Sequence, residues 1–250
     1  MQKRRQKITE IVNREGRITF THLKEHFPDI SEMTLRTDLK YLDETGAIIR
    51  VHGGAKSIDT VAGTDGYFAQ RIVRNQDRKL QIAQKAVTLM HGRGSAFVDS
   101  GSTTTLMSRY FPDEERQIYT CGVSCATELA ALTKPTVHLL GGQMNRYSLS
   151  VAGGRSLLEL QSCHFEVCFI GVTSFHEKMG FGCESERDCV LKQMVLRQSE
   201  YKVALIDSSK FDMYSTHCIC KTNEVDAVVS DDQLTAEQRM FFERQGVKVY

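Results

Sequence analysis

The sequence predicts an α/β protein built from an N-terminal winged helix-turn-helix and a C-terminal, mostly parallel α/β domain. Three observations support this fold class. Apolar residues recur at helical spacing near the N-terminus, a strand-like segment and a glycine pair follow them, and helices alternate with strands from residue 68 onward. Such alternation is typical of a parallel sheet that helices cover on both faces.

The segment from Ser31 to Leu42 has the features of a helix with one buried face. Ser31 suits the N-cap, because its hydroxyl can accept from free N–H groups of the first turn, and Glu32 favours the positive helix end. Leu35, Leu39 and Leu42 recur at i, i+4 and i+7, which predicts one buried stripe. The other faces are free to enter a groove of DNA.

Two further helices precede this one, and a hairpin follows it. Their apolar positions are Ile8, Ile11 and Val12 in the first helix and Phe20, Leu23 and Phe27 in the second. After Gly46 the residues 47–51 are strand-like, and His52-Gly53-Gly54 is expected to form the tip of a wing. Three short helices of which the third is polar on its outer face are typical of a helix-turn-helix.

Basic charge is concentrated in the same part of the chain. Residues 1–56 hold 11 Lys/Arg and 8 Asp/Glu, a net charge of +3, whereas the remainder holds 21 and 23, a net charge of −2. A basic domain gains affinity for DNA by releasing counterions. The candidate phosphate contacts are Arg4, Arg5, Lys7, Arg50 and Lys56. Ordinary solvated charges are the alternative, and the winged-helix pattern favours DNA binding over it.

The pattern divides the chain into three segments. We predict a DNA-binding domain over residues 1–56, a linker rich in small and polar residues over 57–67, and an α/β domain over 68–250. Within the α/β domain, one helix is predicted over 80–90 and another over 105–110. Strands are predicted at 96–98, 117–120, 136–140, 167–172, 203–206 and 227–229.

A Ser/Thr-rich loop follows the first of these strands. In open parallel sheets the ligand binds beyond the carboxyl ends of the strands, where Asp99-Ser100-Gly101-Ser102-Thr103-Thr104 lies. Glycine lets an anion approach the backbone, hydroxyls donate, and a helix N-terminus adds partial positive charge, which together predict a phosphate cradle. A plain Ser/Thr-rich turn with an N-cap is the alternative.

Other strand ends favour the cradle. Thr120-Cys121-Gly122 follows a second strand, Gly141-Gly142 a third and Asp207-Ser208-Ser209-Lys210 another. Arg146 and Lys210 would add positive charge, although either cation taken alone is as well explained as a solvated loop residue, and Asp99 or Asp207 can accept from sugar hydroxyls. We expect a small phosphorylated polyol to bind at Asp99, Ser100, Gly101, Ser102, Thr103, Thr104, Thr120, Gly142, Arg146 and Lys210.

An ordered series of motifs resembles the DeoR-type repressors of sugar metabolism. At the N-terminal end these are Thr34-Leu35-Arg36-Thr37-Asp38-Leu39 and Arg50-Val51-His52-Gly53-Gly54-Ala55. Farther along they are Phe68-x-x-Arg71, Lys79-x-x-Ile82-Ala83, the 99–104 loop, Leu140-Gly141-Gly142, Phe169-Ile170-Gly171 and Asp207-Ser208-Ser209-Lys210-Phe211. The sequence departs from the family in three places: Thr37 stands where many members carry a basic residue, the turn over 27–31 is one residue longer than usual, and Cys121 stands where an asparagine is common.

The resemblance implies a transcriptional repressor of a sugar-catabolism operon. Its C-terminal domain would resemble ribose-5-phosphate isomerase and bind a sugar phosphate, while the winged helix would bind a double-stranded DNA operator. The expected DNA-binding residues are Ser31, Thr34, Arg36, Thr37, Lys40, Arg50 and His52. Asp38 is expected to brace the helix or the wing. A homo-oligomer is expected, because two recognition helices then meet two half-sites.

Two other classes of function are open. A sugar-phosphate isomerase or deaminase needs a carboxylate base and a cation. The chain offers these residue types at Asp99, Glu184, Glu186, Lys192 and Lys210, but their spacing does not assign them such roles. A metal or redox sensor would draw on Cys121, Cys125, His217, Cys218 and Cys220. The eight cysteines contain no Cys-x-x-Cys pair, which favours inert thiols. Neither enzymatic activity, a cofactor nor a metal ion is predicted.

Composition also indicates the cellular compartment in which the protein is expected. The basic start of the chain is not followed by an apolar stretch, so no signal peptide is predicted. No run approaches the ~18 apolar residues that a membrane helix needs. The expectation is a cytoplasmic protein with reduced thiols.

Overall fold

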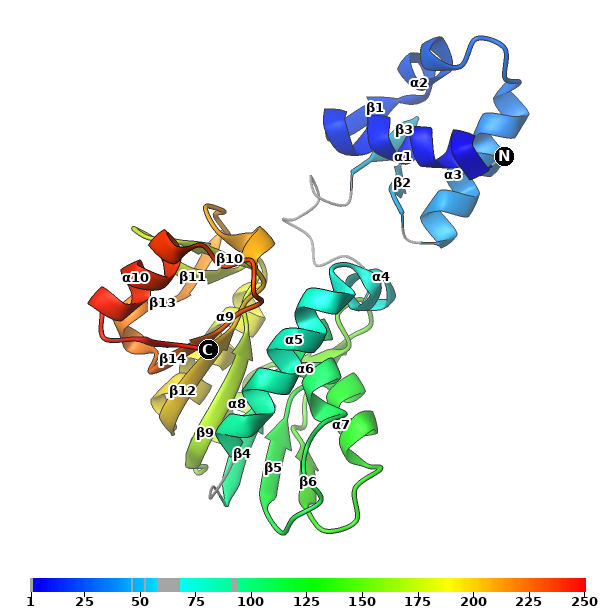
Figure 1. The fold of residues 1–250 in the computed structure, drawn as a ribbon. Coiled ribbons are helices and arrows are strands. Elements are labelled where there is room, and N and C mark those ends of the chain that lie inside the picture. The colour runs from blue at the N-terminus through cyan, green and yellow to red at the C-terminus, as the bar shows by residue number, and fades with distance from the viewer. Residues whose placement is uncertain (1, 46, 52, 58–67, 91–93) are drawn as a thin grey trace. The chain divides into compact units, whose positions relative to one another are not determined.

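The computed structural model describes residues 2–45, 47–51, 53–57, 68–90 and 94–250, and Figure 1 shows its fold. The chain forms two compact units, Met1–Arg71 and Ile72–Tyr250. Gly46, His52 and residues 58–67 of the predicted linker lie outside the described residues.

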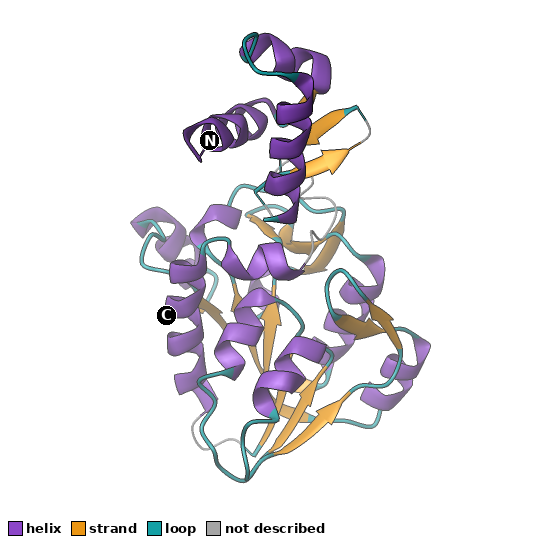
Figure 2. Cartoon of the chain, turned by 90° about the vertical axis from the view of Figure 1, so that its right-hand side faces the viewer, coloured by secondary structure: helices purple, strands orange, loops and turns teal. Residues whose placement is uncertain are grey.

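The N-terminal unit is a winged helix. Its elements are α1 (Gln2–Glu15), β1 (Arg17–Thr19), α2 (Phe20–His26), α3 (Glu32–Glu44), β2 (Ile49–Val51) and β3 (Gly54–Lys56). The three strands form one antiparallel sheet in the order β1-β3-β2, and Figure 2 shows it beside the helices. The three predicted helices and the hairpin are confirmed, and the short β1 is an addition that the sequence pattern did not indicate.

Local hydrogen bonds start and join the helices of this unit. Thr19 caps α2 by accepting from His22 N at 3.2 Å, and Ser31 caps α3 by accepting from Thr34 N at 3.2 Å. Between these helices Lys24 Nζ donates to the carbonyl oxygens of Pro28 at 2.8 Å and Ile30 at 2.6 Å. One lysine therefore holds the turn of the helix-turn-helix.

The wing requires glycine at position 54. Gly54 lies in β3, which is the central strand and pairs with Thr19 of β1 and Val51 of β2. A Cβ atom at this position would lie 2.1 Å from the Ile18 carbonyl oxygen. A side chain would therefore push β3 away from β1, and the hairpin would lose its place against the helices.

The C-terminal unit is built around a seven-stranded parallel sheet in the order β15-β14-β12-β9-β4-β5-β6. Its first half contains α5 (Gln76–Val87), η1 (Thr88–Met90), β4 (Ser95–Val98), α6 (Ser102–Ser108), β5 (Gln117–Thr120), α7 (Val123–Leu129), β6 (Thr136–Leu139), β7 (Gln143–Asn145), β8 (Ser150–Ala152) and α8 (Gly154–Leu160). The preceding helix α4 (Phe68–Val73) contains the border between the units.

The second half of this unit completes the sheet. It contains β9 (Phe165–Gly171), β10 (Ser174–His176), β11 (Gly180–Cys183), α9 (Glu186–Arg197), β12 (Ser199–Leu205), η2 (Ser208–Lys210), β13 (His217–Cys220), η3 (Thr222–Glu224), β14 (Ala227–Val229), α10 (Ala236–Arg244) and β15 (Lys248–Val249). All six strands predicted for this domain are present and parallel, which confirms the α/β fold class.

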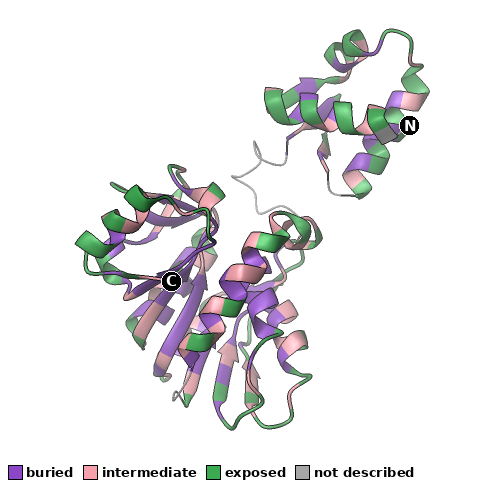
Figure 3. Cartoon of the chain, viewed as in Figure 1, coloured by how far each residue is buried: buried purple, intermediate pink, exposed green. Residues whose placement is uncertain are grey.

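Alternating side chains of the sheet serve two separate cores. Phe97 faces a core that includes α8, α9 and α10, whereas its neighbours Ala96 and Val98 face a core that includes α5, α6 and α7. Figure 3 shows the central strands as buried. Burial on both faces explains why β9 reads as a continuous apolar run rather than an alternating one.

Two small sheets lie outside the predicted pattern. The strands β7 and β8 form a hairpin, and β10, β11 and β13 form an antiparallel sheet. These strands are only three or four residues long, so they offer too few positions for periodicity to be detected. Among the described residues, no helix is long and apolar enough to cross a membrane.

Asp38 joins the recognition helix to the first helix. Its side chain is buried, and its two carboxylate oxygens accept from Arg4 Nε at 2.5 Å and Arg5 Nε at 2.8 Å. Burial alone would raise the pKa of Asp38, but the hydrogen bonds from Arg4 and Arg5 outweigh it and lower the pKa. The carboxylate thus braces α3 against α1. It also occupies the guanidinium groups of Arg4 and Arg5, which were predicted to contact phosphates.

We expect Asp38→Asn to destabilise the winged helix by roughly 2 kcal/mol, the range of hydrogen bonds to charged groups. Because the pKa of the folded state lies below the ordinary value of 3.8, the stabilisation is present above that pH and is lost as the pH falls through the folded value. Thermal unfolding followed by circular dichroism from pH 3 to pH 7 tests both effects. Asp29→Asn, at an exposed position, is the control, and equal losses in the two variants would contradict the bracing role.

Candidate nucleic-acid interface and effector site

The outer face of α3 carries most of the residues predicted to bind DNA. Ser31, Arg36, Thr37 and Lys40 are exposed there, and Thr34 is half-buried. The hydroxyls already bond locally: Ser31 Oγ lies 2.9 Å from Thr34 Oγ1, and Thr37 Oγ1 donates to the Met33 carbonyl at 2.9 Å. A hydroxyl keeps a spare lone pair after such a bond, so each can still accept from or orient a partner.

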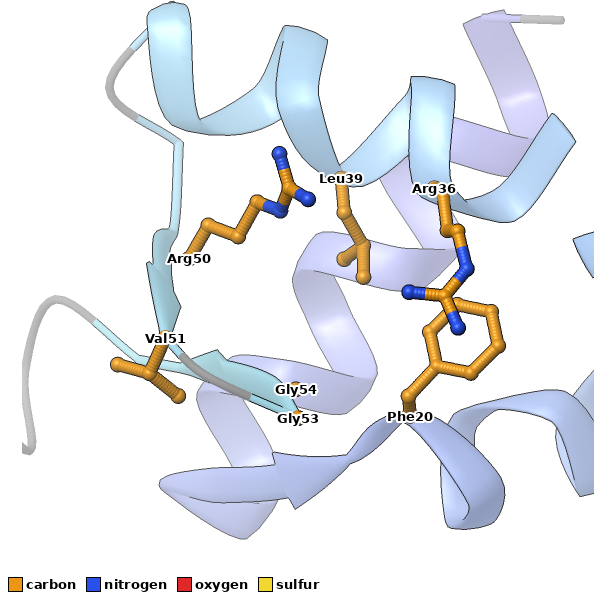
Figure 4. A pocket seen from close by; sticks show the side chains of 7 residues that line it. All are labelled: Phe20, Arg36, Leu39, Arg50, Val51, Gly53 and Gly54. Carbon is orange, nitrogen blue, oxygen red and sulfur yellow. The ribbon is translucent and has the colours of Figure 1, made fainter. Parts of the chain in front are cut away.

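Arg36 is held in place by an aromatic ring. Its guanidinium lies over the Phe20 ring (Figure 4). The guanidinium carbon is 4.2 Å from the ring centre, and 54% of the Arg36 side chain is exposed. The contact limits the freedom of a long side chain while leaving its N–H groups available. Arg36 therefore points a pre-oriented cation at the surface of α3.

A groove separates α3 from the wing. It has a volume of about 320 Å³ and is lined by Phe20, Arg36, Leu39, Arg50, Val51, Gly53 and Gly54 (Figure 4). The backbone N–H of Arg50 donates to Asp43 Oδ1 at 2.8 Å, which fixes the wing to the end of α3. Two arginines from different elements thus border one groove. The seventh predicted residue, His52, lies outside the described residues.

Acidic neighbours on α3 pair weakly with its cations. Arg36 NH2 lies 3.6 Å from Glu32 Oε2, and Lys40 Nζ lies 3.7 Å from Glu44 Oε1. Exposed pairs of this kind contribute little to stability, so a phosphate can displace the carboxylates at small cost. Met33, 76% exposed on the same helix, adds an apolar surface beside these cations.

At the carboxyl edge of the large sheet, Asp99 forms a buried ion pair. Lys192 of α9 donates to Asp99 Oδ2 and to the Gly171 carbonyl at 2.9 Å, and Gly171 N donates to the same Asp99 oxygen at 2.9 Å. Burial would lower the pKa of Lys192, but the charge of Asp99 outweighs it and raises the pKa. Asp99 therefore joins β4, β9 and α9, and Lys192 is a buried partner that the sequence reasoning left unassigned.

The helix after Asp99 begins earlier than predicted. The structure starts α6 at Ser102 rather than at residue 105, because Gly101 with φ +143° forms its N-cap. Thr104 and Thr105 each donate a hydroxyl hydrogen bond to the Gly101 carbonyl. Ser102, Thr103 and Thr104 are buried in the first turn, and Ser100 and Gly101 are half-buried.

The next strand ends pack closely against this loop. Thr120 is buried, and its hydroxyl accepts from Gly122 N at 3.0 Å. Cys121 Sγ donates to Asp99 Oδ1 at 3.5 Å. A Cβ on Gly122 would lie 3.0 Å from Ser100 Cα, and one on Gly142 would lie 2.7 Å from Ser156 Oγ. The loops after β4 and β5 therefore touch, while Gly142 lies against the start of α8.

Lys210 and Asp207 form a second charged group at this edge. Lys210 Nζ donates to the Val172 carbonyl at 2.8 Å and lies 3.7 Å from Asp207 Oδ2. Burial would raise the pKa of Asp207, but the charge of Lys210 and a hydrogen bond from Ser209 outweigh it and lower the pKa. Asp207 Oδ2 is buried and accepts no hydrogen bond from the described residues. This oxygen is a candidate acceptor for a ligand hydroxyl.

The 207–210 loop also contacts the start of α5. Asn75 Nδ2 donates to Asp207 Oδ1 at 3.3 Å and to Ser209 Oγ at 3.0 Å, and Arg78 NH1 donates to Ser208 Oγ at 3.1 Å. Asn75 has φ +49°, a left-handed conformation that asparagine tolerates better than most residues. The sequence prediction missed these contacts, because they join residues more than a hundred positions apart.

Arg146 is placed differently from the other predicted effector residues. It lies in the exposed turn between β7 and β8, where it stacks on Tyr147 and donates to its hydroxyl at 3.0 Å. Within the part of the chain that the structure describes, no hydrogen bond or ion pair links Arg146 to the strand-end loops. Its assignment to the effector site stays a prediction.

The cysteines are mostly packed in the cores. Six are buried, whereas Cys163 and Cys218 are half-buried. Burial raises the pKa of the Cys121 and Cys125 thiols, and it raises the pKa of Cys168 to about 11. Neutral buried thiols are poor nucleophiles and poor metal ligands, which supports the interpretation of inert thiols.

Comparison with protein families covers both units. The DeoR-like helix-turn-helix domain matches residues 4–61, and the DeoR C-terminal sensor domain matches residues 74–232. Together with the winged helix and the parallel sheet, these matches define a two-domain transcriptional regulator. The chain belongs to the DeoR family.

Whole-length relatives agree with this assignment. The chain is 28% identical over 249 residues to the HTH-type transcriptional regulator GolR of Listeria innocua, covering 98% of this chain and 96% of that protein. It is 29% identical over 237 residues to the lactose phosphotransferase system repressor of Streptococcus mutans, covering 93% and 92%. These relatives are regulators, so the family assignment does not support the enzyme alternative.

A solved structure resembles part of the chain. Ribose 5-phosphate isomerase A from Methanocaldococcus jannaschii matches with a TM-score of 0.38 and 16% identity over 55% of each chain. Nothing about activity follows from a similarity of this size.

We expect Arg36→Ala to weaken binding to operator DNA by about 10- to 100-fold, the usual cost of losing an arginine that reads a base. Fluorescence anisotropy with operator and unrelated duplexes over a range of salt concentrations measures the loss. A base contact predicts a loss confined to the operator, whereas a phosphate contact predicts a uniform loss and a shallower salt dependence. Arg155→Ala, at an exposed position on α8, is the control, and unchanged affinity in Arg36→Ala would remove Arg36 from the interface.

Proposed function

We propose that this regulator represses a sugar-catabolism operon and that a phosphorylated sugar bound at the carboxyl edge of the large sheet controls it. The winged helix would bind a double-stranded operator through α3 and the wing. The relative named as a lactose phosphotransferase system repressor supports the link to sugar uptake and breakdown. The observation on which the effector proposal mainly rests is the meeting of charged and polar strand ends at one sheet edge, within the segment matched by the sensor domain.

Chemistry at this edge suits a sugar phosphate. Lys210 supplies a partly exposed cation for the phosphate, and Ser100 lies beside a glycine whose backbone an anion can approach. Asp207 Oδ2, which accepts no hydrogen bond from the described residues, suits a sugar hydroxyl. Asp99 is committed to Lys192 and Gly171, so we assign it a positioning role within the site.

The same loop offers a route from effector to DNA-binding domain. Asp207, Ser208 and Ser209 contact Asn75 and Arg78 at the start of α5. This helix follows closely on the segment that connects the two domains in sequence. An effector that displaces the 207–210 loop would therefore move the first part of the sensor after the linker. Such coupling requires that the effector bind one arrangement of the loop more tightly than the other.

Operator recognition would use more than one copy of the chain. A single winged helix contacts one half-site, and paired copies gain specificity by binding two half-sites at fixed spacing. A homo-oligomer is therefore part of the proposal. Sedimentation of the protein with and without operator DNA tests it.

A thermal-shift screen with phosphorylated and free sugars tests the effector proposal. A ligand that binds only the folded state raises the melting temperature by mass action. We expect one sugar phosphate to raise it and the corresponding free sugar to leave it unchanged. If no phosphorylated sugar shifts the melting temperature, the effector proposal is wrong, while the assignment of the winged helix to DNA is unaffected.

We expect Lys210→Ala to weaken binding of that sugar phosphate by about tenfold or more, because a charge-assisted contact to phosphate is lost. Affinity for operator DNA without effector should be unchanged. Isothermal titration with the sugar phosphate and anisotropy with the operator measure the two. Lys248→Ala, exposed at the amino end of β15, is the matched control, and an unchanged dose response in Lys210→Ala would place the effector elsewhere.

We expect Arg78→Ala to separate the two activities. Effector binding and operator binding should each stay within about threefold of the native values, whereas the effect of the sugar phosphate on operator affinity should shrink, because coupling energies are typically 1–3 kcal/mol. Operator titrations at zero and saturating effector give the coupling. Gln76→Ala, at an exposed position two residues before Arg78 on the same helix, is the control. Full coupling in Arg78→Ala would exclude this route.

A further inference from the structure

Three side chains with metal-binding atoms meet on the winged helix, and none of them lines the groove between α3 and the wing. They are Glu15 at the end of α1 and His22 and His26 on α2. Glu15 Oε2 lies 3.4 Å from His22 Nδ1, and Glu15 Oε1 lies 3.5 Å from His26 Nε2. Among the described residues, these three form the group of His, Cys, Asp and Glu whose ligand atoms all lie within 4.8 Å of one another.

The fold places these side chains together for simple reasons. His22 and His26 are four residues apart on α2, so they lie on the same face of the helix. Their ring centres are 5.1 Å apart. The Thr19 cap fixes the backbone at His22. Glu15 ends α1 and is only a three-residue strand away from α2, so its carboxylate reaches both rings.

The spacing suits one small divalent ion. Zn²⁺ binds imidazole nitrogen and carboxylate oxygen at about 2.0–2.2 Å, and the ligand atoms of a tetrahedral site then lie about 3.3–3.5 Å apart. The two Glu15–histidine distances, one from each carboxylate oxygen, are 3.4 and 3.5 Å, and all of the ligand atoms lie within 4.8 Å of one another. Two imidazoles and one carboxylate leave a fourth position open for water, as in His₂Glu zinc sites.

We propose that Glu15, His22 and His26 form a site for a divalent first-row transition metal such as Zn²⁺. Imidazole and carboxylate donors favour these ions over Mg²⁺ or Ca²⁺, which prefer all-oxygen sites. The bound ion links the end of α1 to α2, and so it stabilises the first half of the helix-turn-helix.

One neighbouring cation competes for the carboxylate. Arg14 NH2 lies 3.2 Å from Glu15 Oε1, and 67% of the Arg14 side chain is exposed. A pair of this kind between adjacent surface residues is weak, so Arg14 can turn into solvent when the metal binds. The ligands themselves are accessible, since 52% of His22 and 33% of His26 are exposed.

Calorimetric titration of the full, reduced chain with Zn²⁺ tests the proposal. We expect His26→Ala and Glu15→Gln each to lose one bound Zn²⁺ or to weaken one binding event by at least about tenfold. Even residues that only orient a metal ligand change affinity by about 10- to 100-fold. The stoichiometric comparison separates this site from any contribution of the half-exposed thiols of Cys163 and Cys218, which the variants leave intact.

His164→Ala is the matched control. His164 is an exposed histidine that pairs with Glu200 at 3.0 Å but belongs to no group of three metal-binding side chains in the described part of the chain. It should bind Zn²⁺ like the native protein. Melting temperatures in the presence of a chelator should agree within about 2 °C for all variants, because none of the altered side chains belongs to a hydrophobic core. If native, His26→Ala and Glu15→Gln proteins bind Zn²⁺ with equal stoichiometry and affinity, the proposed site does not exist.

Discussion

The buried ion pair between Asp99 and Lys192 organises the carboxyl edge of the large sheet. A charge removed from water costs several kcal/mol unless it is paired and hydrogen-bonded. Asp99 therefore has to keep Lys192 of α9, the Gly171 backbone and the Cys121 thiol around it. This constraint fixes the ends of β4, β5 and β9 relative to one another. The half-buried Ser100 and the 207–210 loop are then presented at an edge that is already rigid.

Sequence predicted the elements far better than the contacts between them. The strand β9 was predictable because Val, Ile and Phe form a run buried on both faces, and α3 was predictable because Ser31, Leu35 and Leu39 mark its start and stripe. The start of α6 was missed by three residues, because only the φ of Gly101 reveals that the helix begins at once. Strands as short as β10, which has three residues, are too short for an alternation of apolar and polar residues to be recognised.

Side-chain roles depend on partners that are remote in sequence. In the sequence, Lys192 cannot be told from a solvated lysine on a helix surface. Only its contact with Asp99, 93 positions away, shows that it is a buried cation. Arg4 and Arg5 count as basic residues for DNA until Asp38 takes their guanidinium groups. Arg36 shows the reverse, since stacking on Phe20 leaves its charge exposed and orders it. Net charge therefore overestimates the cations available to phosphates in the winged helix.

The pairing of Lys210 with Asp207 gives the proposed effector response a physical basis. Asp207 is buried, and Lys210 lies 3.7 Å from its Oδ2, which receives no hydrogen bond from the described residues. A phosphate that draws Lys210 away removes the largest of the charges that compensate Asp207, and a ligand hydroxyl or a shift of the loop can replace it. A sugar phosphate can supply both groups at once, whereas inorganic phosphate supplies only the anion. The same loop contacts Asn75 and Arg78 at the start of α5, so a shift of the loop also changes the contacts that hold this helix.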